Sequence, residues 1–80
     1  MKKVISAKAN DDFTLELIFT DGTVRLFDTR PYHGVGIFTE LADPTYFKDF
    51  AIVYGTVQWK NEQDFAPETL FLESIELVEV

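Results

Sequence analysis

The segment Phe13-Thr-Leu-Glu-Leu-Ile-Phe-Thr-Asp-Gly-Thr-Val-Arg-Leu-Phe27 decides the fold. Two runs in which apolar and polar residues alternate flank the dipeptide Asp21-Gly22. Asp-Gly at such a position is typical of a β-hairpin, because the two-residue type I′ turn needs a positive φ at both central residues. We therefore predict two antiparallel strands joined by a two-residue loop.

A loop of that length also sets the register of the hairpin. Phe19 then lies opposite Val24, and Leu17 lies opposite Leu26. Both pairs share one face with Leu15, because side chains alternate along a strand. The other face is a mixed and half-covered surface, with Glu16, Ile18 and Thr20 opposite Phe27, Arg25 and Thr23.

A further strand is predicted before this hairpin, over residues 3–9. It places Ile5, Ala7 and Ala9 on one face. It ends at Asn10-Asp11-Asp12, and short Asn and Asp side chains favour turns. The first 27 residues are therefore predicted to form a three-stranded antiparallel meander.

From residue 28 onward the pattern becomes helical for a short distance. Ile37, Phe38 and Leu41 recur at helical spacing. Asp43-Pro44 is typical of a helix start, with Asp as the N-cap and Pro at the first helical position. The aromatic residues Tyr46, Phe47 and Phe50 follow on one face.

The remaining chain predicts one more strand and one more helix. Residues 51–59 have strand composition, and Gly55 within them suggests a bulge or a close backbone approach. Pro67-Glu68 opens a short helix that turns Leu70 and Phe71 inward. Residues 75–80 fit a last strand or a continued helix, and we favour the strand. The prediction is one α+β domain over residues 1–80: an antiparallel meander of three N-terminal strands, a later strand and two short helices.

Composition limits the functions that the chain can perform. The 80 residues include 14 Asp or Glu, seven Lys or Arg, one His and no Cys, for a net charge of −7. Without cysteine there is no disulfide, thiolate nucleophile or cysteine-bound zinc. Affinity for nucleic acids and for anionic membranes depends on cationic side chains, so direct binding of either is disfavoured. No apolar run approaches the length of a membrane span, and we expect a cytoplasmic protein.

The negative charge is concentrated at the C-terminal end. Residues 61–80 contain six carboxylates, those of Glu62, Asp64, Glu68, Glu73, Glu76 and Glu79, and no Lys or Arg. Such a segment can attract a basic protein, because complementary fields raise association rates. Acidic surface can also serve solubility alone.

Catalytic chemistry is sparse. The only histidine is His33 and the only serines are Ser6 and Ser74, in no arrangement typical of a catalytic triad. A lone loop histidine is more often a turn residue or one bonded to a carbonyl than a catalytic group. We expect no enzymatic activity, metal or cofactor. The alternative is a small-molecule-binding or enzymatic domain that uses the loop around His33 with Asp28 and Asp64.

Aromatic residues offer anchors for a protein partner. Trp and Tyr are enriched at interface hot spots, which makes Tyr54 and Trp59 candidates. In so short a chain, however, a core position for Trp59 is favoured, because the domain needs buried area. An unprotected sheet edge would also allow a homodimer. The candidate interaction residues are Tyr54, Trp59, Asp64, Glu68, Glu73 and Glu76.

Six motifs, taken in order, resemble the bacterial domain of unknown function family 2442. They are Phe19-Thr-Asp-Gly22, Phe27-Asp-Thr-Arg-Pro31, Gly36-Ile-Phe38 with Leu41, Asp43-Pro-Thr-Tyr-Phe47, Gly55-Thr-Val-Gln-Trp59 and Asp64-Phe-Ala-Pro-Glu-Thr-Leu-Phe71. The resemblance covers residues 4–74. It implies a small α+β domain without an established enzymatic activity, often encoded beside a second small protein in a toxin–antitoxin-like arrangement.

The resemblance makes this domain the proposed antitoxin. Together with the acidic C-terminal end, it leads us to expect a small basic protein, such as a toxin, as the partner. Two features depart from the family. The family has Pro-Asn-Gly after the tryptophan, whereas this chain has Lys60-Asn61-Glu62, which predicts a longer or differently bent turn. Some relatives append a helix-turn-helix, for which this chain leaves no room, so we do not expect direct DNA binding.

Overall fold

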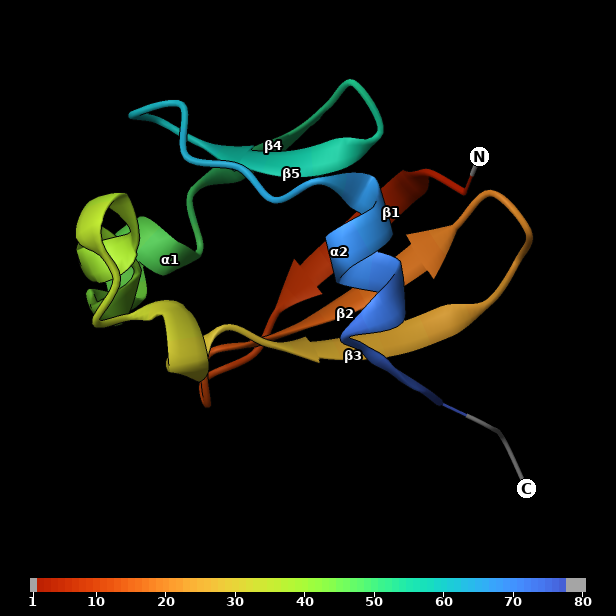
Figure 1. The fold of residues 1–80 in the computed structure, drawn as a ribbon, viewed down its shortest axis with the longest axis horizontal. Coiled ribbons are helices and arrows are strands. Elements are labelled where there is room, and N and C mark those ends of the chain that lie inside the picture. The colour runs from red at the N-terminus through yellow and green to blue at the C-terminus, as the bar shows by residue number, and fades with distance from the viewer. Residues whose placement is uncertain (1, 78–80) are drawn as a thin grey trace.

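The N-terminal strands form the expected antiparallel meander. The computed structural model describes residues 2–77. Strands β1 (Val4–Ala9), β2 (Thr14–Phe19) and β3 (Val24–Asp28) pair in sequence order (Figure 1). The short strand β6 (Ile75–Glu76) pairs with β3 and completes the order β1-β2-β3-β6. The strand predicted at 75–80 is thus confirmed for its first residues, and its last three lie outside the described residues.

The loop between β2 and β3 has three residues rather than the predicted two. The Gly22 N–H donates to the Phe19 carbonyl (2.9 Å), and the Phe19 N–H donates to the Thr23 carbonyl (3.0 Å). Gly22 has φ 85°, whereas Asp21 is not among the residues with positive φ. This is the three-residue hairpin loop in which a type I turn is followed by one left-handed residue.

The longer loop shifts the register by one residue. Leu15 lies opposite Phe27, and Leu17 lies opposite Arg25. The predicted pairs Phe19–Val24 and Leu17–Leu26 are therefore wrong. Phe27 and Arg25 lie on the core side of the sheet rather than on the mixed outer surface.

Strand β1 contains an irregularity that the alternation pattern did not show. Val4 pairs with Phe19 and Ser6 pairs with Ile18, so Ile5 is an extra residue, as in a β-bulge. Val4 is buried and Ile5 is 59% exposed. Ala7 and Ala9 pack against the core as predicted, but the placement of Ile5 with them is wrong.

The segment 51–59 forms a hairpin rather than one strand. Strands β4 (Phe50–Val53) and β5 (Thr56–Trp59) make a separate two-stranded sheet. Tyr54 and Gly55 form the two-residue turn, and both have positive φ (52° and 79°), as a type I′ turn requires. The close backbone approach predicted at Gly55 is confirmed, because its carbonyl accepts the Val4 N–H at 2.8 Å.

Short helices connect the two sheets. Helix α1 (Pro44–Phe47) begins as predicted: the Asp43 carboxylate accepts the N–H groups of Thr45 (3.0 Å) and Tyr46 (3.5 Å). It ends before Phe50, which belongs to β4. The helix α2 (Pro67–Leu72) also begins as predicted and buries Leu70. Two 3₁₀ helices precede α1, η1 (Arg30–Tyr32) and η2 (Gly36–Ala42).

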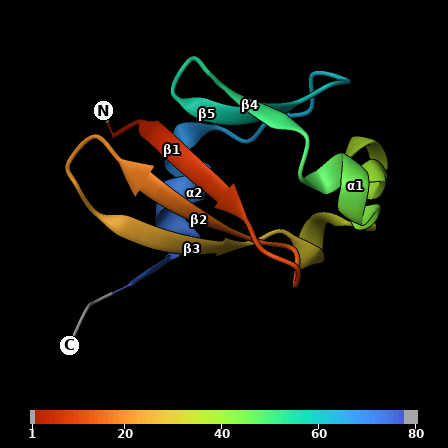
Figure 2. The same ribbon diagram turned by 180° about the vertical axis from the view of Figure 1, so that it is seen from behind.

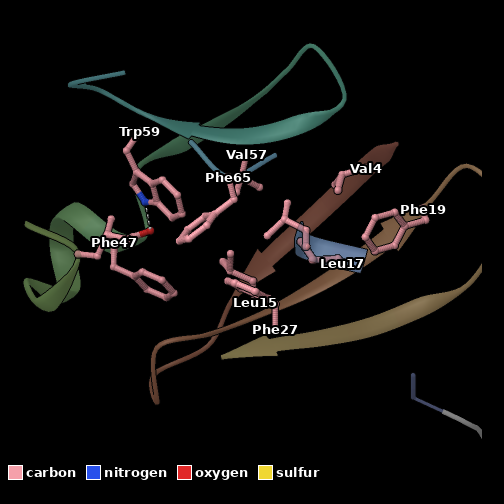
Figure 3. Packing of buried hydrophobic residues seen from close by; sticks show 11 residues of the cluster. Val4, Leu15, Leu17, Phe19, Phe27, Phe47, Val57, Trp59 and Phe65 are labelled. Atoms are coloured by element: carbon pink, nitrogen blue, oxygen red, sulfur yellow. Dashed lines mark hydrogen bonds between the residues drawn. The ribbon is translucent and has the colours of Figure 1, made fainter. Parts of the chain in front are cut away.

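The core lies between the meander on one side and α2 with the β4–β5 hairpin on the other (Figure 1). Four of its aromatic rings lie close together, those of Phe27, Phe47, Trp59 and Phe65, whereas Phe19 lies at the other end of the sheet (Figure 3). The buried hydrophobic residues are Val4, Leu15, Leu17, Phe19, Phe27, Leu41, Phe47, Val57, Trp59, Phe65 and Leu70. Seen from behind, β1, β2 and β3 lie in front of α2, and no other element crosses their outer face (Figure 2).

The loop after β5 has the geometry of the β2–β3 loop. The Glu62 N–H donates to the Trp59 carbonyl, and the Trp59 N–H donates to the Gln63 carbonyl, both at 2.9 Å. Glu62 has φ 64° and occupies the left-handed position. Of the two expectations for this turn, a longer loop or a different bend, the longer loop is wrong. The turn is tight and holds Glu62 where glycine is most easily accommodated. No helix within residues 2–77 is long and apolar enough to cross a membrane.

Candidate protein-interaction surface

Basic side chains are largely occupied by carboxylates within the chain. Six of the seven Lys and Arg residues lie within 4.0 Å of an Asp or Glu oxygen. The carboxylates in these pairs are those of Asp11, Glu16, Asp21, Asp28, Asp49 and Glu76. The uncompensated negative charge therefore lies on other acidic residues.

Residues 61–77, which we name the acidic segment, carry much of this uncompensated charge. Within residues 2–77, the carboxylates of Glu62, Asp64 and Glu68 have no cation within 4.0 Å. All three residues are exposed. Exposed carboxylates without an internal cation are free to meet cationic groups of another molecule.

The two remaining candidate acids of this segment have internal partners. Glu73 accepts a hydrogen bond from the Tyr32 hydroxyl, and this bond raises the pKa of Tyr32 above its ordinary value. The Glu76 carboxylate lies 3.7 Å from Arg25 Nη1. Both residues are nevertheless exposed, so each keeps part of its carboxylate surface open.

A polar network holds the start of the acidic segment in place. The side chain of Gln63, 2% exposed, accepts from the Tyr46 hydroxyl (2.5 Å) and donates to the carbonyl of Ile37 (2.9 Å). It also donates to Glu40 Oε1 (2.9 Å), and the Asn61 amide donates to both Glu40 oxygens (2.8 Å). The turn and the helices η2 and α1 are thus tied together.

Sequence reasoning missed this network. It treated Lys60-Asn61-Glu62 only as a turn, and neither periodicity nor composition distinguishes a buried glutamine after such a turn from an exposed one. The length of the loop is the feature from which the burial of Gln63 could have been predicted. A three-residue loop after Trp59 returns the chain at Gln63 directly opposite that buried ring, and this position can be buried only if its polar atoms are bonded.

Tyr54 lies at the tip of the β4–β5 hairpin and is 92% exposed. The hairpin is attached to β1 just beyond it, through the bond between Gly55 and Val4. A Cβ at Gly55 would lie 2.8 Å from side-chain carbons of Lys3, so the two segments are in direct contact. Tyr54 is therefore an exposed aromatic ring on a backbone that is held in place.

Trp59 is a core residue, as the sequence favoured. It is 2% exposed and stacks near Phe47, with ring centroids 6.1 Å apart. Its Nε1–H donates to the carbonyl of Phe47 at 2.8 Å (Figure 3). Its role is to connect β5 to the end of α1, and its ring is not available to a partner.

His33 takes part in a local network with Thr29 and Phe13. The hydroxyl of Thr29, a fully buried residue, donates to the Phe13 carbonyl (2.7 Å) and lies 3.0 Å from His33 Nε2. Because that hydroxyl has one proton, the hydrogen bond to His33 requires a proton on Nε2. Burial lowers the pKa of His33 below its ordinary value of 6.5, although Asp28 opposes the shift.

The three residues of the alternative site have different hydrogen-bond partners. Asp28 binds Arg30 through both carboxylate oxygens at 2.8–3.2 Å, while Asp64 pairs with Gln58 in an isolated bridge. Two open hollows, of about 370 and 410 Å³, lie elsewhere. One lies beside Phe50, Trp59 and Lys60, the other beside Lys2 and Phe71, and none of His33, Asp28 and Asp64 lines either hollow. Within residues 2–77 no group of three His, Asp or Glu side chains is placed to hold a metal ion.

Comparison with protein families gives a match over nearly the whole chain. Residues 4–76 match the family described as protein of unknown function (DUF2442), which is nearly the whole chain and agrees with the six sequence motifs. No curated protein and no solved structure matches the chain. The chain belongs to the DUF2442 family.

Proposed function

We propose that this protein is a non-enzymatic interaction module that binds a small basic protein and neutralises it, in the manner of an antitoxin. The observation that carries the proposal is the separation of charge. Six of the seven cationic residues are paired within the chain, whereas Glu62, Asp64 and Glu68 are exposed without a cation among residues 2–77.

The acidic segment supports fast and selective association. Its exposed carboxylates would steer a cationic partner toward the α2 side of the molecule, since complementary charge raises the association rate. The Gln63 network holds the first part of the segment in one conformation, so less entropy is lost on binding. Neutralisation would then occur by covering the partner's functional surface.

Tyr54 is the proposed aromatic anchor. An exposed tyrosine on a constrained hairpin tip presents a large area with few rotatable bonds, as hot-spot residues do. Among the described residues that sequence analysis suggested, Tyr54, Asp64, Glu68, Glu73 and Glu76 remain in the proposed surface. Trp59 is removed from it because its ring is buried.

Co-expression with the protein encoded next to it, followed by co-purification, tests the proposal. The triple variant Glu62→Gln/Asp64→Asn/Glu68→Gln should bind the partner roughly tenfold more weakly, because an exposed ion pair contributes about 0.2–1 kcal/mol. The matched control Asp11→Asn/Glu16→Gln/Asp28→Asn removes the same charge from carboxylates that are already paired and should retain binding. Separate elution at low salt, or equal weakening by both triple variants, would contradict the proposed surface.

A further inference from the structure

The outer face of the meander carries an apolar patch that no part of residues 2–77 covers. Because Leu15, Leu17 and Phe19 face the core, the alternate residue Ile18 faces outward. Val24 pairs with Ile18 across the strands, and Leu26 pairs with Ile75. We name this patch the outer sheet face; its apolar residues are Ile5, Ile18, Val24, Leu26, Ile75 and Leu77.

These side chains are more exposed than aliphatic residues on a sheet normally are. Ile75 is 70% exposed and Ile18 is 37% exposed. Leu77, whose N–H donates to the Val24 carbonyl at 2.8 Å, is 39% exposed. An antiparallel sheet with one solvated face normally carries polar residues there. Aliphatic residues on four neighbouring strands therefore indicate a surface that is covered in the functional state.

We propose that the outer sheet face joins two copies of this chain face to face. The charge distribution favours a second copy. The charged side chains on this face are paired, Lys8 with Glu16 (4.0 Å) and, at the end of β3, Asp28 with Arg30 (2.8 Å). The face is thus nearly neutral although the chain carries −7.

The unpaired carboxylate of Glu68 lies away from this contact. Glu68 is on α2, which lies behind the sheet when the outer face is viewed (Figure 2). Two molecules stacked through the outer sheet face would therefore keep their α2 helices on opposite sides of the dimer. A basic partner is less suited to this face, because it offers no uncompensated carboxylate to a cation.

The size of the patch fits a weak dimer. The four strands have 6, 6, 5 and 2 residues, and at about 3.3 Å per residue and about 4.8 Å between strands they cover roughly 300 Å². A stable interface buries about 800 Å² per partner, so the contact is expected to be reversible and concentration-dependent. Two such sheets would pack about 10 Å apart as in a β-sandwich.

The dependence on salt concentration distinguishes this dimer from the complex with a basic partner. Each copy carries −7, so the copies repel one another at long range. Raising the salt from about 0.1 M to about 1 M shortens the screening length from about 10 Å to about 3 Å. The dimer should therefore become tighter at high salt, whereas binding of the acidic segment to a cationic protein should become weaker. The dimer is independent of the proposed function, and either can fail alone.

Sedimentation equilibrium of the purified chain across a concentration series tests the proposal. The wild type should pass from 9.2 kDa toward twice that mass, and more readily at high salt. Ile75→Lys and Ile18→Lys should each weaken the dimer at least about tenfold, since a lysine buried on this face lacks a partner. Ile75 is on the two-residue edge strand and 70% exposed, so its replacement leaves the fold intact even if that of Ile18 does not.

The control Ile37→Lys makes the same change at a residue of η2 that is 66% exposed and lies outside the patch. It should dimerise like the wild type. A wild type that stays monomeric at all concentrations and salts overturns the proposal. So does a dimer that neither Ile75→Lys nor Ile18→Lys weakens, because such a dimer is joined elsewhere. Loss of partner binding in Ile75→Lys, with a monomeric wild type, would assign the face to the partner instead.

Discussion

Glu62 and Gly22 occupy the same position in two loops of identical hydrogen bonding. Each donates its N–H to the carbonyl three residues earlier at 2.9 Å, and each has a left-handed backbone, with φ 64° for Glu62 and 85° for Gly22. A third loop, 10–14, repeats the pattern with Phe13 at φ 65°. The domain therefore builds three of its turns in one way but uses glycine in only one of them.

Replacing Glu62 with glycine should stabilise the domain. A left-handed backbone costs an L-residue roughly 1–2 kcal/mol, and glycine avoids this cost. The unfolded chain is more flexible with glycine, which lowers stability by about 0.5–1 kcal/mol, so a net gain of about 0.5–1 kcal/mol is expected. Urea unfolding followed by circular dichroism measures it. Glu62→Ala is the control, since it removes the charge but keeps the strain and should change stability little. Equal stabilisation by both variants would attribute the effect to charge.

The sequence predicted features that depend on neighbouring residues. Asp43-Pro44 starts a helix because capping and a fixed φ act within a few residues, and this was confirmed. The order of the three meander strands was also predicted correctly from the sequence. The close approach at Gly55 was also predicted correctly, although the chain reverses direction there.

The wrong predictions concern places where one residue more or less in a loop shifts the register of the strands. Asp21-Gly22 fits a two-residue or a three-residue loop, and only the position of Phe27 in the core distinguishes the two. The true two-residue turn contains Tyr54, which gives no turn signal because aromatic residues are rare at positive φ. For the candidate interaction surface, the negative charge and the core position of Trp59 could be predicted from the sequence. The pairing of the cations within the chain depends on tertiary contacts and could not.

Thr29→Val should destabilise the domain by about 1–3 kcal/mol. The substitution keeps the shape of a fully buried residue but removes the hydroxyl that donates to Phe13 and accepts from His33. The His33 donor then loses its partner in a partly buried site. Thermal and urea unfolding measure the loss. Thr29→Ser retains the hydroxyl and should recover most of it; equal losses in both would point to packing of the methyl group.

His33 should be neutral at pH 7 with its proton on Nε2. Burial lowers its pKa in the folded state, while the unfolded chain takes up a proton near the ordinary value of 6.5. The unfolded state therefore binds more protons, so the stability that neutral His33 provides is present above pH 6.5 and is lost as the pH falls through the folded pKa.

Long-range ¹H–¹⁵N spectra of the ring identify the tautomer and its titration midpoint. In His33→Gln, which keeps an N–H donor but does not titrate, the dependence of stability on pH should flatten in this window. A proton on Nδ1 in the neutral ring would contradict the hydrogen bond to Thr29. A midpoint above 6.5 would contradict the lowering of the pKa by burial.

Tyr54 links backbone strain to the proposed interaction. It is 92% exposed and takes φ 52° as the first turn residue of the β4–β5 hairpin, a position that asparagine accepts far more readily. Tyr54→Asn should therefore stabilise the domain by about 0.5–1 kcal/mol, since it relieves strain and loses almost no buried contact. The same variant should bind the basic partner at least about threefold more weakly, because an aromatic anchor is removed. Urea unfolding and a titration of the partner measure the two effects.

Backbone strain at Tyr54 is expected to persist only if the residue has a function that opposes its replacement. If Tyr54→Asn is more stable and binds as well as the wild type, Tyr54 is not part of the interface. Tyr54→Phe is the matched control: it keeps both the ring and the strain, and should bind and unfold like the wild type.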